Sequence, residues 1–348
     1  MAPSTHTAAV VNEKGNVELK EIPVPEVGEG DVLVKVVAAA LNPTDWKTPK
    51  AWANKPGAVA GYDFSGIVKE LGPGAEAAGL KVGDRVATFV NGARSANGAY
   101  AEFVVAKAYF CISLPESWTF EQGAAIGVAI YTTFQMFYES HNLPTPYAKA
   151  PQTIPMLLYG ASSSVGLFAS QVAKASGFRV FAVCSPKNFD LVRGFGADAT
   201  FDYHDGDVSS QIKAASEGKI KVAIDTISEQ GSSKIIVPAL SSEGGKISTI
   251  LPYTKEDMAA LGSNVTQHFS VAYDLLEDRP FAASRLGDAE KYCVLAKRLL
   301  VEGKVRPTPI RIWKNGLQDI NDAMQFMIDG KVSGEKIVFR IADTPGLA

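Results

Sequence analysis

The sequence predicts an α/β protein that combines a parallel sheet and its crossover helices with a second, mainly antiparallel β unit. Short β-rich runs separated by Pro and Gly turns fill the first third of the chain, and strand-like and helix-like patterns alternate through the middle. β character returns near the C-terminus, in PTPIRIW and EKIVFRIA, and we expect these strands to rejoin the first unit. With 348 residues the chain exceeds the size at which one core usually stops growing, so we expect two domains, one of them discontinuous.

The first β unit extends from Thr7 to about Cys111. Its strands are expected in HTAAVV, DVLVKVVAAAL, SGIVKEL, DRVATFV and YAEFVVA. Turns such as PVPEVGEGD and LGPGAE separate these runs, which is typical of a compact antiparallel arrangement.

The middle of the chain consists of repeated βα units. TIPMLLYG precedes the helical SVGLFASQVAKASG, and RVFAVC, ATFDY and VAIDTI each precede a further helical segment before GGKISTIL closes the series. Such repeats predict a parallel sheet with right-handed crossovers. We therefore divide the chain into residues 1–122, 123–302 and 303–348.

Charge and cysteine content argue against several classes of protein. The net charge is -3, with Lys and Arg interspersed among acids, so the chain lacks the basic face of a nucleic-acid-binding protein. Cys111, Cys184 and Cys293 are far apart and form no CxxC pair, which argues against a disulfide scaffold and a cysteine-rich metal site. No apolar stretch reaches the ~20 residues of a membrane span, and we expect a cytoplasmic protein.

The segment GASSSVG follows the strand-like PMLLY and opens a helical pattern. A strand-to-helix turn directs backbone N–H groups at a bound anion, and a pyrophosphate fits there. The strict GxGxxG pattern is absent, but Gly160 ends the strand and Gly166 lies where a missing side chain allows close packing. The serines could donate hydroxyls to phosphates, or one of them could simply cap the helix. The candidate cofactor contacts in this turn are Gly160, Ser162, Ser163, Ser164 and Val165.

The next strand ends in CSPKN, where the sequence indicates which cofactor is bound. NAD-preferring sites usually carry an Asp or Glu near this point for the ribose 2′-hydroxyl, but here the first carboxylate is Asp190. Ser185, Lys187 and Asn188 suit a 2′-phosphate instead, which predicts NADP(H). The alternative is a helix cap followed by Pro in the first turn, and both interpretations can hold at once.

The order of these units and several motifs resemble the medium-chain dehydrogenase/reductase superfamily. The motifs are NPTDWK at 42–47, GYDFSGIV at 61–68, VGDRV at 82–86, GAYAEF at 98–103 and GASSSVG. The resemblance covers nearly the whole chain and implies a Rossmann-type NADP-binding domain at 123–302 and a GroES-like catalytic domain at 1–122, to which 303–348 returns. The block at 184–203 most resembles the fungal trans-acting enoyl reductases that serve polyketide synthases of the lovastatin type, and related ToxD-like oxidoreductases.

The resemblance also implies that no catalytic zinc is bound. Zinc alcohol dehydrogenases of this superfamily have a Cys where this chain has Asn42, and a His-Glu pair where it has Tyr62 and Asp63. The four histidines are scattered and offer no tetrahedral ligand set by spacing. Without a Lewis acid, reduction of an activated C=C bond is less demanding than alcohol oxidation, because one hydrogen-bond donor at the developing enolate is worth roughly 3 kcal/mol.

The resemblance places Asn42, Pro43 and Lys47 beside the nicotinamide and ribose of the cofactor, and Thr132 close to the nicotinamide. The candidate catalytic residues are Lys47 as a donor to substrate or cofactor, Tyr62 as a donor to the enolate or a proton source, and Thr132. Each has a plainer alternative, as a solvated lysine, a packing aromatic or a small polar residue in a packed helix. No single proton donor emerges, and solvent can serve.

Further cofactor contacts are expected at the ends of later strands and in one loop. Tyr203 would lie beside the adenine end, with a half-buried strand-end aromatic as the alternative. By resemblance, the backbone at Ile250 and Leu251 contacts the nicotinamide, and the loop with Ser333 and Glu335 returns to the cofactor or is only a turn before the last strand.

The segment 252–288 is expected to form a wall of the substrate pocket and the edge of the sheet, or else core or a subunit contact. Its notable side chains are Phe269, Tyr273, Phe281 and Arg285.

Together these features predict an NADPH-dependent, zinc-independent enoyl reductase acting on an α,β-unsaturated thioester or ketone. The alternatives are a quinone reductase and a catalytically silent NADPH-binding protein. The resemblance implies a possible polyketide synthase partner, and a monomer is favoured over a homodimer.

Overall fold

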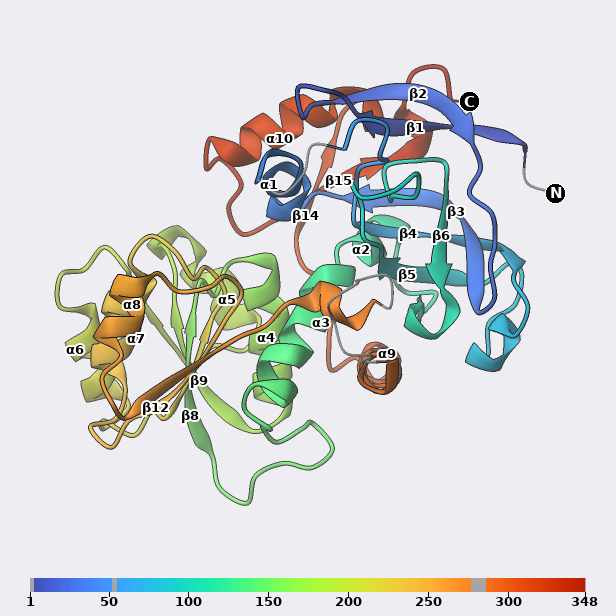
Figure 1. The fold of residues 1–348 in the computed structure, drawn as a ribbon. Coiled ribbons are helices and arrows are strands. Elements are labelled where there is room, and N and C mark those ends of the chain that lie inside the picture. Colours follow the sequence, from blue (N-terminus) through green and yellow to red (C-terminus); the bar gives the residue numbers. More distant parts are fainter. Residues whose placement is uncertain (1–2, 52–54, 277–285, 348) are drawn as a thin grey trace. The chain divides into compact units, whose positions relative to one another are not determined.

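The computed structural model describes residues 3–51, 55–276 and 286–347, without the side chains of 48–51 and 286 (Figure 1). Contacts within the chain divide it into two compact units. We call Met1–Val128 with Tyr273–Ala348 the β-rich unit, and Ala129–Ala272 the parallel-sheet unit. The predicted fold class, a parallel-sheet domain with a discontinuous β-rich domain, is confirmed.

The unit boundaries differ from the sequence-based division at 122/123 and 302/303. Helix α9 (Leu286–Val301) belongs to the β-rich unit, where it packs against η2 (Ala108–Phe110) and β7 (Ile112–Ser113). Its apolar pattern resembles that of the helices in βα units, so the sequence pattern alone does not reveal which sheet it covers.

The β-rich unit is built on a mixed sheet whose central strand, β3, pairs with three others. Strand β15 lies antiparallel to β3, with Phe339 opposite Ala39, so the C-terminal strands rejoin the first unit as expected. The strands of this sheet are β3 (Asp31–Ala40), β4 (Asp63–Leu71), β5 (Arg85–Phe89), β6 (Phe103–Lys107), β7, β14 (Ile310–Trp313) and β15 (Lys336–Arg340), and β1 (Thr5–Val11) and β2 (Val17–Pro23) form a separate two-stranded sheet. The helices besides α9 are α1 (Pro43–Ala51), α2 (Phe120–Ala124) and α10 (Ile320–Ile328), and α3 (Gly127–Phe134) leads into the parallel-sheet unit.

The parallel-sheet unit contains six parallel strands in the order β10-β9-β8-β11-β12-β13. Figure 1 labels β8, β9 and β12 of this sheet. These are β8 (Ile154–Tyr159), β9 (Phe178–Val183), β10 (Ala199–Phe201), β11 (Val222–Asp225), β12 (Gly245–Thr249) and β13 (Val265–Phe269). The helices are α4 (Ser164–Ala175), α5 (Phe189–Gly194), α6 (Val208–Ala215), α7 (Ser232–Ala239) and α8 (Lys255–Ala260). Strand β13 forms an edge, as predicted for the segment that begins at residue 252.

Alternating side chains of this sheet fill two layers of core, because successive residues of a strand point to opposite faces. Leu157, Phe181 and Ala223 share a buried cluster with Ile212 of α6 and Ile236 of α7. Helix α4 lies on the other face of the sheet (Figure 1).

The strand order reverses at β8, which lies between β9 and β11. In open parallel sheets, ligands bind beyond the carboxyl ends of the strands at such a switch point. The carboxyl ends of β8 and β11 are therefore where a ligand is expected.

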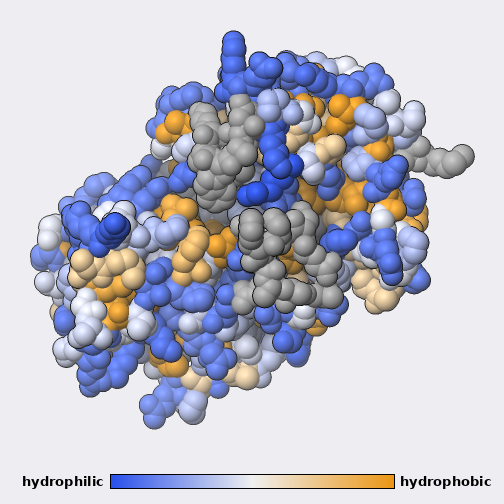
Figure 2. All heavy atoms as spheres, viewed as in Figure 1, coloured by the Kyte–Doolittle hydropathy of each residue, from blue (hydrophilic) through white to orange (hydrophobic). Residues whose placement is uncertain are grey.

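Hydrophilic side chains cover most of the face seen in Figure 2, with smaller apolar areas between them. Within the described residues, no helix has the length and apolar character needed to span a bilayer.

Candidate functional site

The turn after β8 requires glycine at both of its ends. Gly160 has a φ of 72°, and a Cβ there would lie 2.5 Å from Thr226 Oγ1. A Cβ on Gly166 would lie 2.4 Å from the carbonyl oxygen of Gly160. Backbone atoms cannot move aside as a flexible side chain can, so Gly166 is what lets α4 approach the end of β8 this closely.

The hydroxyl of Ser163 caps helix α4, which was one of the two roles left open for the serines. Its Oγ accepts the N–H of Gly166 at 2.9 Å and lies 2.9 Å from Thr226 Oγ1. The N–H groups of Ser164 and Val165, in the first turn of α4, have no acceptor within the helix. Together with the partly exposed Ser162, they form a turn that fits a pyrophosphate.

At the end of β9, Ser185 lies beside the aromatic residue that follows β10. Ser185 Oγ is 3.1 Å from the hydroxyl of Tyr203, and its side chain makes no capping bond to the 3-10 helix at Pro186–Asn188. Lys187 is exposed. Asp190 points to solvent and pairs with Arg193 at 3.3 Å, so its carboxylate does not substitute for the missing acid. The structure thus brings together two of the side chains predicted to bind the adenosine end.

Beyond β12, the backbone at Ile250 is already engaged. Its N–H donates to Ser228 Oγ at 2.9 Å. Ser228 follows β11, and its backbone N–H donates to the buried carboxylate of Asp225 at 2.8 Å. Burial raises the pKa of Asp225, while the surrounding donors oppose that rise. Sequence reasoning missed Asp225 and Ser228, although polar residues at the carboxyl end of a switch-point strand are a recognisable signal.

Helix α3 carries the predicted Thr132 and its neighbour. Thr132 is 6% exposed, whereas Thr133 is fully buried and donates its hydroxyl to the carbonyl of Ala129 at 2.9 Å. Thr133 therefore makes a structural hydrogen bond within the helix, and a contact of Thr132 with the nicotinamide stays a prediction.

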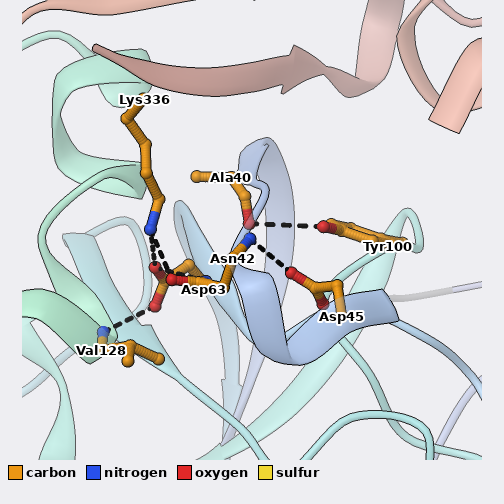
Figure 3. A network of polar contacts seen from close by, with 7 residues as sticks. All are labelled: Ala40, Asn42, Asp45, Asp63, Tyr100, Val128 and Lys336. Atoms are coloured by element: carbon orange, nitrogen blue, oxygen red, sulfur yellow. Dashed lines mark hydrogen bonds and ion pairs between the residues drawn. The ribbon is translucent and has the colours of Figure 1, made fainter. Parts of the chain in front are cut away.

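In the β-rich unit, a buried polar cluster joins Lys336 to Asn42 and Asp63, two positions at which the resemblance implies that zinc-dependent members differ (Figure 3). Lys336 Nζ donates to Asp63 Oδ2 at 3.0 Å and to Asn42 Oδ1 at 2.5 Å. Asn42 Nδ2 donates to Asp63 Oδ2 at 2.8 Å, and the backbone N–H of Val128 donates to Asp63 Oδ1 at 2.6 Å. The ammonium of Lys336 thus supplies the positive charge that compensates Asp63.

A second carboxyl lies in the same interior. Asp45, in the first turn of α1, is 1% exposed and accepts the backbone N–H of Asn42 at 2.6 Å. Burial raises the pKa of Asp45 to about 7, although the Asn42 N–H and the hydroxyl of Tyr100 both lower it. Near neutral pH this carboxyl is therefore partly protonated in the folded protein.

Tyr62 is 1% exposed, and its ring centroid lies 5.0 Å from that of Tyr273. This packing agrees with the plainer interpretation of Tyr62, and its catalytic role stays a prediction. Phe269 ends the edge strand β13 and is 37% exposed, while Phe281 and Arg285 lie outside the described residues.

The remaining predicted residues lie at the surface of the β-rich unit. Pro43 begins α1 and is exposed, and Lys47 Nζ lies 5.5 Å from the ring centroid of Trp46. Ser333 is half-buried, and Glu335 forms an ion pair with Arg311 at 2.7 Å. The ion pair gives Glu335 a structural partner, so its contact with a cofactor stays a prediction. In the described part of the chain, no group of three or more His, Cys, Asp or Glu side chains could hold a metal ion.

Comparison with known families identifies the class of protein. Residues 28–116 match the family described as "Alcohol dehydrogenase GroES-like domain", and residues 164–272 match the one described as "Zinc-binding dehydrogenase". An alcohol dehydrogenase superfamily protein from Novosphingobium aromaticivorans has the same fold, with a TM-score of 0.82 and 24% identity over 96% of this chain and 99% of that one. The chain belongs to the medium-chain dehydrogenase/reductase superfamily of oxidoreductases.

Within this superfamily, the chain resembles fungal proteins named trans-enoyl reductase. It is 36% identical to "Trans-enoyl reductase ACTTS2" of Alternaria alternata, over 97% of this chain and 99% of that one. It is 38% identical to "Trans-enoyl reductase resD" of Aspergillus sclerotiorum, over 92% of this chain and 95% of that one. The resemblance inferred from the block at 184–203 is confirmed.

Proposed function

We propose that the protein is an NADPH-dependent reductase of C=C bonds conjugated to a thioester or ketone carbonyl, and that it works without a metal. One observation carries the proposal: Ser185 Oγ and the Tyr203 hydroxyl, 3.1 Å apart, lie at the adjacent ends of β9 and β10, with no carboxylate in the CSPKN segment. Hydroxyl groups and the nearby ammonium of Lys187 accommodate a 2′-phosphate, which a carboxylate would repel.

The parallel-sheet unit offers the groups that hold such a cofactor. The N–H groups of Ser164 and Val165 and the hydroxyl of Ser162 suit the pyrophosphate, and the backbone beyond β12 suits a carboxamide. When bound, a reduced nicotinamide supplies a hydride to the β-carbon of the substrate.

The contacts of Asp63 in the β-rich unit support a mechanism without a catalytic metal. Both carboxylate oxygens of Asp63 are occupied by Lys336, Asn42 and the N–H of Val128, which leaves this donor set unsuited to a divalent cation. A hydrogen-bond donor at the carbonyl oxygen of the substrate then supplies the stabilisation of the developing enolate. We assign this part to Lys47, which is more accessible than the buried Tyr62, with Thr132 aiding orientation.

The relatives named trans-enoyl reductase support a carrier-bound substrate. We propose that the enoyl group is delivered by a separate polyketide synthase, and that the protein acts as a cytoplasmic monomer. Cys111, Cys184 and Cys293 are all buried and none of them is in a disulfide, as a reducing compartment permits.

The test follows NADPH absorbance with a panel of enoyl thioesters, enones and quinones. Turnover of enoyl thioesters above all other acceptors is expected, and Lys47→Met should lower kcat/KM at least tenfold. Lys20→Met is the matched control, because Lys20 is an exposed lysine paired with Glu18 on β2. Quinone turnover alone would replace the proposal by a quinone reductase, and tight NADPH binding without turnover would indicate a silent binding protein.

A further inference from the structure

The segment Asp225–Thr226–Ile227–Ser228, at the carboxyl end of β11, contacts both parts of the chain that are expected to hold the cofactor. We propose that Thr226 and Ser228 are positioning residues: Thr226 fixes the phosphate turn, and Ser228 fixes the backbone that faces the nicotinamide carboxamide. This inference rests on the proposed function, because it presupposes a nicotinamide cofactor.

Thr226 closes a chain of hydrogen bonds across the turn. The N–H of Gly166 donates to Ser163 Oγ at 2.9 Å, and Ser163 Oγ lies 2.9 Å from Thr226 Oγ1. Thr226 Oγ1 in turn lies 2.9 Å from the carbonyl oxygens of Gly160 and Tyr159, either of which can accept its proton. Because a hydroxyl has only one proton, Thr226 donates to a carbonyl and accepts the Ser163 proton. The two ends of the turn are thereby linked through two hydroxyls.

This direction of donation changes the role expected of Ser163. Its proton goes to Thr226, and its oxygen accepts from Gly166, so its hydroxyl is engaged within the protein. The hydroxyls left for the phosphates are those of Ser162 and Ser164, together with the N–H groups at the start of α4.

Ser228 fixes the backbone beyond β12, as Thr226 fixes the phosphate turn. It has a φ of 59°, a left-handed conformation that is costly for a residue with a Cβ. Asp225 holds it there: Asp225 Oδ1 accepts the Ser228 N–H at 2.8 Å, and the Asp225 carbonyl accepts the Ser228 hydroxyl at 3.0 Å. The Ser228 oxygen is then aimed at the N–H of Ile250, which it accepts at 2.9 Å.

The carboxylate of Asp225 is itself held from two further sides. Its Oδ2 accepts the hydroxyls of Ser232 at 2.6 Å and Tyr253 at 2.9 Å. With the N–H groups of Ile227 and Ser228 on Oδ1, this buried acid has four donors and cannot rotate without losing hydrogen bonds, so the conformation of Ser228 is well defined.

The consequence is a specific donor and acceptor pair for the cofactor. Since the N–H of Ile250 is used by Ser228, the groups that remain for a carboxamide are the carbonyl of Ile250 and the N–H of Leu251. A carboxamide needs one acceptor for its NH₂ and one donor for its oxygen, and these two groups supply one of each.

The experiment measures binding by isothermal titration with two probes, NADPH and ADP-ribose 2′-phosphate. The second probe retains the pyrophosphate and the 2′-phosphate of NADPH but lacks the nicotinamide. Thr226→Val should weaken both probes about tenfold, and Thr226→Ser should restore them. Ser228→Gly should weaken NADPH about tenfold but leave ADP-ribose 2′-phosphate unchanged. Glycine tolerates the positive φ, so this variant removes the hydroxyl without backbone strain. Ser216→Ala, whose hydroxyl bonds Lys213 elsewhere in the unit, is the matched control.

Each outcome decides between explanations. If Ser228→Gly weakens both probes equally, or neither, the role assigned to Ser228 is wrong while the proposed function stands. If the Thr226→Val protein binds both probes as tightly as the wild type does, Thr226 does not fix the phosphate turn. A wild-type protein that binds neither NADPH nor NADH would overturn the proposed function and this inference with it. Hydrogen exchange at the amide of Ile250 in the free protein adds a readout without cofactor, and it should quicken in Ser228→Gly but not in Ser216→Ala.

Discussion

Lys336 and Asp63 form an ion pair in the interior of the β-rich unit, with Nζ 3.0 Å from Oδ2 and side chains that are 4% and 0% exposed. Lys336 begins β15 and Asp63 begins β4, so the pair joins strands that are 273 residues apart in sequence. Asn42 bridges both side chains (Figure 3). The pair therefore ties the returning C-terminal segment to the start of β4.

Removing one partner of this pair should be strongly destabilising. Lys336→Met leaves the buried Asp63 charge without its cation, and a loss of about 3–5 kcal/mol in the free energy of unfolding is expected. Urea unfolding of the two proteins measures it. The double variant Lys336→Met/Asp63→Asn removes the unpaired charge and should recover part of the loss. If the free energy of unfolding of Lys336→Met lies within about 1 kcal/mol of the wild-type value, the ion pair does not stabilise the fold in this way.

The buried carboxyl of Asp45 should make the stability depend on pH. Its pKa is about 7 in the folded protein, against 3.8 ordinarily, so the folded state binds the proton more tightly. The contribution of Asp45 to the free energy of unfolding therefore falls as pH rises from about 4 to about 7, and it stays at its lowest above pH 7. Asp45→Asn mimics the protonated form and removes that fall. Above pH 7 the free energy of unfolding of the variant should therefore exceed that of the wild type by an amount on the order of 4 kcal/mol. Urea unfolding at pH 5 and pH 8 tests this, and an equal effect of the substitution at both would contradict it.

The protein should purify without stoichiometric zinc, because Oδ2 of Asp63 accepts from Lys336 and Asn42, and its Oδ1 accepts the N–H of Val128. Elemental analysis of protein grown with added zinc checks this. One zinc per chain would overturn the proposed mechanism.

A feature of the fold or of the candidate site can be predicted from the sequence when the residues that produce it are close together in the chain. Local patterns are sufficient for the βα repeats and for the glycines at 160 and 166, because each follows from periodicity or from a turn. The return of the C-terminal strands is instead what the resemblance implies. The Lys336–Asp63 pair could not be predicted, since it depends on which strands become neighbours. The same holds for Ser228 and Ile250, which meet only because β11 and β12 are adjacent.

Gly166→Ala should damage both stability and cofactor binding. The added Cβ would lie 2.4 Å from the Gly160 carbonyl oxygen, so α4 must shift away from β8. We expect a loss of about 1–3 kcal/mol in the free energy of unfolding and a weaker affinity for NADPH. Gly206→Ala is the control, because a Cβ there meets nothing within 4 Å. Similar effects of the two substitutions would argue against a close approach of α4.

Ser185→Asp should erase the preference for NADPH over NADH. The new carboxylate would stand beside Tyr203, where it repels a 2′-phosphate and can accept a hydrogen bond from the ribose 2′-hydroxyl of NADH. Dissociation constants for both cofactors, measured by titration, report the change. Ser185→Ala separates the two effects, since it removes the hydroxyl without adding charge and should weaken NADPH only about tenfold or less. Equal affinities of the wild type for NADPH and NADH would show that the CSPKN segment does not select the phosphate.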